Sequence, residues 1–147
     1  MYGSIVVGTD GSETAGEAVR QAIALALATG ATLEIVSAYE PAPRTLVREG
    51  TRRVPIDPQW MLNQREDVEA TLAAAAEQAR AAGVPCAVHS RQGDPADAIL
   101  DVAEEQSADL VVIGNKGMTG AKRFLLGSVP NKISHHAPCS VLIIRTR

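Results

Sequence analysis

The sequence predicts a single α/β domain built on a doubly wound, five-stranded parallel sheet with helices on both faces. Five short runs rich in apolar and β-branched residues alternate with longer segments of helical periodicity. Such alternation is typical of parallel strands joined by right-handed crossovers. Two runs, Ile5–Val7 and Leu110–Ile113, are continuously apolar, as in strands covered by helices on both faces. The length of 147 residues suits one domain, 1–147.

The expected elements follow one another in a simple order. The strands are expected at Ser4–Gly8, Thr32–Ala38, Cys86–Ser90, Asp109–Ile113 and Ser140–Arg145. The helices are expected at Ser12–Thr29, Gln59–Ala82, Pro95–Gln106 and Pro130–His136. A helical segment thus follows each of the first four runs of strand character, and the fifth run comes after the fourth helix.

Local signals mark where two of these helices begin. The third helix has the clearest start, because Asp94 suits the N-cap and Pro95 the first helical position. The first helix has two candidate starts. Either Ser12 is its N-cap, or Thr14 and Glu17 form a capping box.

Residues 41–58 interrupt the alternation. They hold four prolines and four arginines with little apolar periodicity. We expect a long surface loop there, between the second strand and the second helix, and loops of this length are usually functional.

Composition excludes several classes of function. A formal net charge of −3 and an aromatic content of 3% give neither the basic surface nor the stacking platforms of a nucleic-acid-binding protein. No targeting segment is recognisable, and the longest helical apolar run, 22–28, is too short to span a membrane. Cys86 and Cys139 are widely separated, so we interpret them as small buried residues of a cytoplasmic protein.

The segment from Gly114 to Val129 carries the main functional signal. It reads Gly114-Asn115-Lys116-Gly117, then nine residues, then Gly127-Ser128-Val129, between an apolar run and a helix start. Glycines leave backbone N–H groups open to an anion, and a helix N-terminus attracts negative charge. The pattern therefore predicts a phosphate-binding loop.

The predicted topology brings a second segment to the same place. Ligands of open parallel sheets bind beyond the carboxyl ends of the strands, where the strand order reverses. That point is expected between the first and fourth strands, which puts Asp10 near the glycine loop. Simpler interpretations stay open: Gly114 and Gly117 form only a turn, Asp10 only caps a helix, and Lys116 and Arg123 are solvated loop charges.

These residues resemble the universal stress protein family. The likeness rests on the Gly-x2-Gly-x9-Gly-Ser spacing that starts at Gly114, and on Asp10-Gly11-Ser12. It extends to the stretches Leu125–Val129 and Pro138–Ile144, and covers essentially the whole chain. The resemblance implies a Rossmann-like sheet of the adenine-nucleotide α-hydrolase type, with strand order 3-2-1-4-5.

The resemblance also implies an adenine-nucleotide site and a ligand, ATP, which Mg²⁺ accompanies if Asp10 helps to hold the metal. Asp10 corresponds to the residue near ribose and phosphates, and Ala38 to the position whose backbone binds adenine. The implied site consists of Thr9, Asp10, Gly11, Ala38, Ile113, Gly114, Asn115, Gly117, Arg123, Gly127, Ser128 and Val129. The apolar last strand, 140–145, is expected at the sheet edge, where strands pair, and the family likeness implies a homodimer through it.

Several functions are compatible with such a site. The first is an ATP-binding stress-response or signalling regulator, and the second a sensor or buffer for AMP or cyclic AMP. Slow ATP hydrolysis or autophosphorylation is a further alternative, although no residue is specified as hydrolytic. An enzyme that splits ATP at its α-phosphate is disfavoured, because Gly8–Ser12 lacks the Ser-Gly-Gly-x-Asp-Ser loop of that class. A P-loop motif is absent, and the intact glycine pattern disfavours a pure interaction module.

Overall fold

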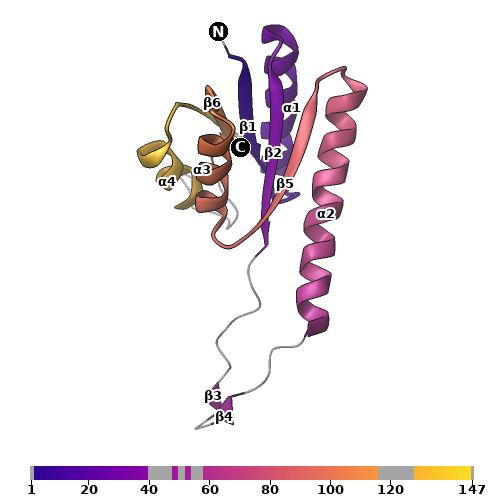
Figure 1. The fold of residues 1–147 in the computed structure, drawn as a ribbon, viewed down its shortest axis with the longest axis vertical. Helices are drawn as coiled ribbons and strands as arrows, with labels where there is room; N and C mark the ends of the chain where they lie inside the picture. The colour runs from indigo at the N-terminus through magenta and orange to yellow at the C-terminus, as the bar shows by residue number, and fades with distance from the viewer. Residues whose placement is uncertain (1, 40–47, 50–51, 54–57, 116–127, 147) are drawn as a thin grey trace.

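The computed structural model describes residues 2–39, 48–49, 52–53, 58–115 and 128–146. A five-stranded parallel sheet with the order β5-β2-β1-β6-β7 forms its centre (Figure 1). These strands are β1 (Ser4–Gly8), β2 (Thr32–Tyr39), β5 (Cys86–Gln92), β6 (Leu110–Gly114) and β7 (Ser140–Ile144). Counted among themselves they stand in the order 3-2-1-4-5, which confirms the predicted fold class and topology.

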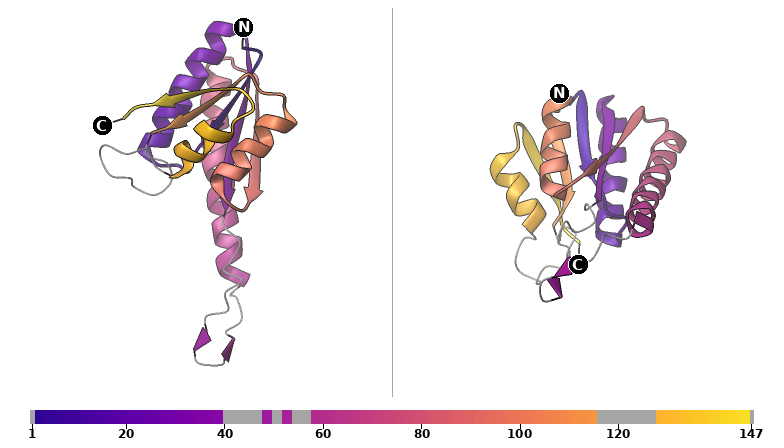
Figure 2. Two further views of the ribbon diagram at one scale, coloured as in Figure 1. Left: turned by 90° about the vertical axis from the view of Figure 1, so that its left-hand side faces the viewer. Right: turned by 60° about the horizontal axis from the view of Figure 1, so that its bottom comes forward.

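Four helices cover the two faces of this sheet. They are α1 (Glu13–Thr29), α2 (Pro58–Ala81), α3 (Pro95–Glu105) and α4 (Ser128–His136). Helices α1 and α2 lie on one face, and α3 and α4 on the other (Figures 1 and 2). Their bounds agree with the predicted ones to within two residues. None of the described helices has the combination of length and hydropathy that a membrane crossing requires.

The segment 41–58 departs from its prediction as a loop without strands. It contains two short antiparallel strands, β3 (Arg48–Glu49) and β4 (Arg52–Arg53), in which Arg48 pairs with Arg53. Strands of two residues carry no readable apolar alternation, so the sequence could not reveal them. The second helix begins at Pro58, whose missing N–H costs nothing at a helix start. The rest of the segment lies outside the described residues.

The core consists of two apolar layers, one on each face of the sheet. Alternate residues of β1 illustrate the division: Ile5 and Val7 pack with α1 and α2, whereas Val6 packs with α3 and α4. Strands β1 and β6 are buried on both faces, as their continuous apolar runs predicted.

The structure decides between the two candidate starts of α1. Ser12 is the N-cap, and its Oγ accepts a hydrogen bond from the N–H of Ala15 at 3.2 Å. The capping box of Thr14 and Glu17 does not form, because α1 begins at Glu13 and Thr14 lies inside it, and Glu17 pairs with Arg20 instead. In α3, Asp94 is the N-cap as predicted and accepts from the N–H of Asp97 at 3.0 Å.

One contact of a buried carboxylate was not foreseen. Glu34 of β2 is only 7% exposed, and its Oε2 lies 3.0 Å from Nε2 of His89 on the neighbouring strand β5. The two residues are 55 positions apart, so only strand pairing brings them together. This contact satisfies a carboxylate that would be costly to bury alone.

Candidate functional site

The strand order reverses between β1 and β6, as the sequence predicted. Chain progression runs from β1 to β2 and β5 on one side, and through β6 and β7 on the other. Val7 of β1 pairs with Val112 of β6, so β1 and β6 end at the same edge of the sheet. The turn after β1 and the first residues after β6 therefore meet at the place where ligands bind in open parallel sheets.

The turn after β1 is held by its own side chains. Thr9 is buried, and its Oγ1 accepts from the N–H of Gly11 at 3.2 Å. Gly11 has a φ of 83°, a conformation that favours glycine. Asp10 is exposed, and its Oδ1 accepts from the N–H of Ser12 at 2.9 Å. Ser12 thus takes the capping position, while Asp10 closes the turn and presents its carboxylate to solvent.

The end of β2 presents backbone groups beside this turn. The N–H of Thr9 donates to the carbonyl of Val36 at 2.9 Å, so Val36 faces β1. On the other side, Tyr39 accepts from the N–H of Gly93. Because backbone groups alternate along a parallel strand, the N–H and C=O of Ala38 face the space beyond the end of β1. The Ala38 side chain packs with the α3 and α4 layer.

Residues at the end of β6 are closely packed. Ile113 is buried in the layer under α3 and α4, and Gly114 approaches the first turn of α1. A Cβ atom at position 114 would lie 2.7 Å from Cγ2 of Thr14 and 3.3 Å from its carbonyl oxygen. Glycine is required there by this contact.

Asn115, one of the predicted site residues, forms hydrogen bonds with β7 and the chain after it. Its N–H donates to the carbonyl of Ile144 at 2.9 Å. Its Oδ1 accepts from the N–H of Thr146 at 3.0 Å and from the hydroxyl of Thr146 at 3.2 Å. The side chain therefore points to the chain after β7.

The second part of the glycine motif is described only at its end. Ser128 is the exposed first residue of α4, and Val129 beside it is buried. Gly117, Arg123 and Gly127 lie outside the described residues.

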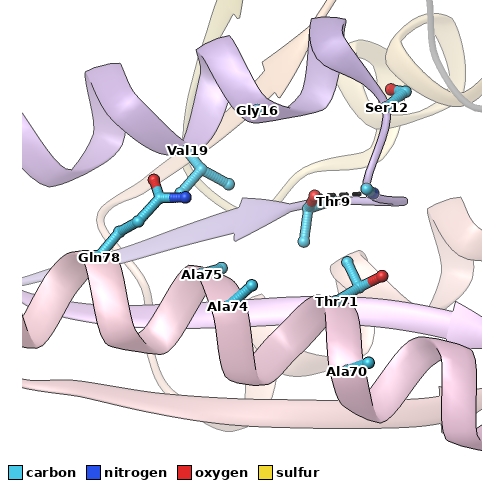
Figure 3. Close-up of a pocket in the computed structure, with 10 residues that line it drawn as sticks. Thr9, Ser12, Gly16, Val19, Ala70, Thr71, Ala74, Ala75 and Gln78 are labelled. Carbon is cyan, nitrogen blue, oxygen red and sulfur yellow. Dashed lines mark hydrogen bonds between the residues drawn. The ribbon is translucent and has the colours of Figure 1, made fainter.

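A cavity of about 350 Å³ lies between the turn after β1, α1 and α2 (Figure 3). Its lining carries no charge. It consists of Thr9, Gly11, Ser12, Gly16, Val19, Ala70, Thr71, Ala74, Ala75 and Gln78. Of the predicted site residues that the structure describes, only Thr9 and Gly11 line it, whereas the side chains of Ala38, Ile113 and Val129 pack on the opposite face of the sheet.

Lys132 of α4 forms ion pairs with two carboxylates at the start of α3. Nζ of Lys132 lies 2.8 Å from Oδ1 of Asp97 and 3.4 Å from Oδ2 of Asp94. The hydrogen bond to Asp97 is the main cause that raises the pKa of Lys132. Within the described ranges, no three His, Cys, Asp or Glu side chains gather closely enough to hold a metal ion.

Sequence reasoning did not single out Thr71 or Thr146. Thr71 contributes to the cavity through the packing of α2 on the turn after β1. Thr146 meets Asn115, which is 31 positions away, through the pairing of β7 with β6. Neither threonine stands in a motif, so their signal lies only in strand register and helix packing.

Comparison with known proteins finds one family over nearly the whole chain. The sequence profile of the universal stress protein family matches residues 1–145. Universal stress protein Rv1636 of Mycobacterium tuberculosis is 38% identical, over 99% of this chain and 97% of the relative. Universal stress protein MJ0531 of Methanocaldococcus jannaschii is 31% identical, over 99% and 83%.

Two similar solved structures contain nucleotides. A universal stress protein in complex with cAMP is 33% identical, with a TM-score of 0.74, over 99% of this chain and 98% of that one. The universal stress protein from Archaeoglobus fulgidus in complex with dAMP is 25% identical, with a TM-score of 0.68, over 97% and 98%.

Proposed function

The chain belongs to the universal stress protein family, and on that premise we propose that it binds an adenine nucleotide, by default ATP, as a stress-response or signalling regulator. The observation that carries this proposal is the meeting of three segments at one edge of the sheet. The turn of Asp10, the backbone groups of Ala38 that face the end of β1, and the glycine-bearing end of β6 lie at the reversal of strand order.

Each segment suits a different part of the ligand. Adenine offers a donor and an acceptor on one edge, which matches the outward N–H and C=O of Ala38. The exposed carboxylate of Asp10 suits ribose hydroxyls, and it suits a Mg²⁺ ion that the phosphates also hold. Thr9 and Gly11 shape the turn that presents Asp10.

We assign the phosphates to the glycine segment, which is the stretch Gly114–Val129 that carries the glycine motif. Ile113 and Gly114 end β6 at the site, and Ser128 and Val129 open α4, where the helix dipole favours an anion. We propose that Asn115, Gly117, Arg123 and Gly127 complete this segment. Asn115 contributes through its position, since its Oδ1 is engaged by Thr146.

A second candidate is a sensor or buffer for cyclic AMP or AMP on the same site. It is favoured by the two related structures that hold cAMP and dAMP. Titration calorimetry with ATP, AMP and cyclic AMP separates the two functions. Tighter binding of ATP supports the first, and tighter binding of a monophosphate supports the second.

The direct test starts with the purified protein. The protein is denatured, and mass spectrometry identifies any released nucleotide.

The variant Gly117→Glu tests the site itself. It places a side chain and a negative charge in the proposed phosphate segment, and is expected to abolish ATP binding with an unchanged circular dichroism spectrum. Leu27→Glu is the matched control, because Leu27 is 59% exposed near the other end of α1. Unimpaired ATP binding by Gly117→Glu would remove the site assignment.

Binding must also appear as a gain in stability. ATP at a hundred times its dissociation constant is expected to raise the free energy of unfolding by about 2.7 kcal/mol. A thermal or urea titration that shows no such gain with any of the three nucleotides contradicts the proposed function.

The proposal includes a cytoplasmic homodimer joined through β7. Strand β7 is at the sheet edge, and its Leu142 is 39% exposed. An exposed apolar edge strand favours pairing with another strand. Cys86 and Cys139 are free thiols, a state that suits the reducing cytoplasm.

A further inference from the structure

Three segments that are distant in sequence meet around Asn115. They are the first turn of α1, the end of β6 and the chain after β7. The N–H and the hydroxyl of Thr146 donate to Oδ1 of Asn115 at 3.0 and 3.2 Å. The hydroxyls of Thr146 and Thr14 lie 3.3 Å apart. Below, the C-terminal clamp means Thr14, Asn115 and Thr146.

The hydrogens of the clamp can be assigned. A hydroxyl has one hydrogen, so when Thr146 donates to Asn115 its oxygen is free to accept from Thr14. The result is a chain of bonds from Thr14 through Thr146 to the amide oxygen of Asn115. Bonds in such a chain polarise one another and strengthen the whole. All three residues are partly buried, so water competes only in part.

The clamp also fixes the backbone at the start of the glycine segment. The N–H of Asn115 donates to the carbonyl of Ile144 at 2.9 Å. The methyl group of Thr14 lies against the Cα side of Gly114. Thr14 thus contacts Gly114 with its methyl group and Thr146 with its hydroxyl. Together with the bonds of Asn115, these contacts fix the backbone direction at the end of β6.

We propose that Thr146 is a positioning residue for the nucleotide site, acting through Asn115 and Thr14 on the direction in which the glycine segment leaves β6. This inference rests on the proposed function. Thr146 does not touch the ligand in this role. It holds Gly114 and Asn115 in place before a phosphate chain binds, and preorganisation of this kind raises affinity.

The coupling has a reciprocal consequence. If the clamp favours ligand binding, the bound ligand must favour the closed clamp by the same factor. The amide hydrogen of Thr146, which is bonded to Asn115, is then expected to exchange more slowly with solvent in the presence of ATP. Bound ATP also slows amides that exchange only through global unfolding, because it stabilises the whole fold. The protection therefore supports the clamp only where the Thr146 amide exchanges by local opening, that is, faster than the buried amides of β1 in the absence of ATP.

The test compares Thr146→Val with Thr146→Ser in the full chain. Valine keeps the shape and removes the hydroxyl, whereas serine keeps the hydroxyl. Calorimetry is expected to show ATP affinity about three- to tenfold weaker for Thr146→Val and within about twofold of the original for Thr146→Ser. Thr14→Val, which keeps the methyl contact with Gly114, is expected to weaken ATP binding similarly. Hydrogen exchange of the Thr146 amide is measured with and without ATP.

The outcomes separate this inference from the proposed function. If the unmodified protein binds none of the nucleotides, both fail. If it binds ATP, and Thr146→Val binds equally well or Thr146→Ser is weakened as much, only the positioning role fails. Unchanged exchange of the Thr146 amide on ATP binding also overturns it. Weakened Thr146→Val, intact Thr146→Ser and ligand-dependent protection together support it.

Discussion

Thr14 in the first turn of α1 packs directly on Gly114 at the end of β6. A Cβ atom on residue 114 would lie 2.7 Å from Cγ2 of Thr14, a distance that real Cβ contacts do not adopt. The contact joins α1 to the start of the glycine segment, and its backbone side, the Thr14 carbonyl at 3.3 Å, cannot move aside by rotation of a side chain.

Gly114→Ala is therefore expected to destabilise the fold by about 1–3 kcal/mol, the usual cost of overpacking. Urea unfolding followed by circular dichroism measures this loss. Gly16→Ala is the matched control, because its Cβ would meet only Nη1 of Arg20 at 3.8 Å. In the middle of α1 that change is expected to stabilise by about 0.5–1 kcal/mol. Equal stability of the two variants would contradict the packing argument.

Filling the cavity beneath the turn after β1 tests where the base lies. Ala74 lines this cavity, and Ala74→Leu occupies part of its 350 Å³. If adenine binds the backbone of Ala38, the new leucine side chain does not touch the ligand. The loss of binding free energy is then smaller than that of one lost hydrogen bond, and ATP affinity is expected to stay within about twofold. Ala73→Leu, which is exposed and outside the lining, is the control. A tenfold loss confined to Ala74→Leu would instead put part of the ligand in the cavity.

Strand β7 provides a test of assembly. Leu142→Lys places a charge on the exposed edge strand, and charged edges resist pairing. We expect analytical ultracentrifugation to show a dimer for the unmodified protein at micromolar concentration and a monomer for Leu142→Lys. Leu27→Lys, on the more exposed Leu27 of α1, is expected to stay dimeric. A monomeric unmodified protein would rule out the proposed dimer.

Asp109 gives the stability a defined pH dependence. The N–H groups of Gly3 and Ser4 donate to its Oδ2 at 2.8 and 3.1 Å, and they lower the pKa of Asp109 below its ordinary value of 3.8. A carboxyl with a lowered folded-state pKa stabilises the fold above its unfolded-state pKa, and this contribution disappears as pH falls through the folded-state pKa.

Asp109→Asn is accordingly expected to be less stable than the unmodified protein at pH 7 and pH 5. The difference is expected to shrink below the ordinary pKa of 3.8 and vanish at lower pH. Urea midpoints at pH 7, 5, 3 and 2 measure it. Other carboxyls titrate in both proteins and cancel in the difference, so a gap independent of pH would refute the role of Asp109.

The predictable features of this fold have local causes. The apolar runs of β1 and β6 exclude every arrangement in which a strand face meets water. Asp94 followed by a proline is typical of a helix start, and α3 begins there. By contrast, the start of α1 could not be decided locally, since Ser12 and Thr14 both suit an N-cap. The folded chain places Ser12 at the N-cap and Thr14 inside the helix, where Thr14 contacts Gly114 and Thr146 from two other elements.

The site divides in the same way. The sequence by itself determined the alternation of strands and helices and the glycine spacing, because each depends on residues close together in the chain. The place where strand order reverses joins β1 to β6 and could be predicted only from general rules of parallel-sheet topology. Only the tertiary structure decided that Ala38 turns its backbone groups toward the end of β1, that Glu34 pairs with His89, and that Thr146 closes on Asn115. Those contacts follow from strand register, which joins residues 27 to 55 positions apart, and no local preference encodes them.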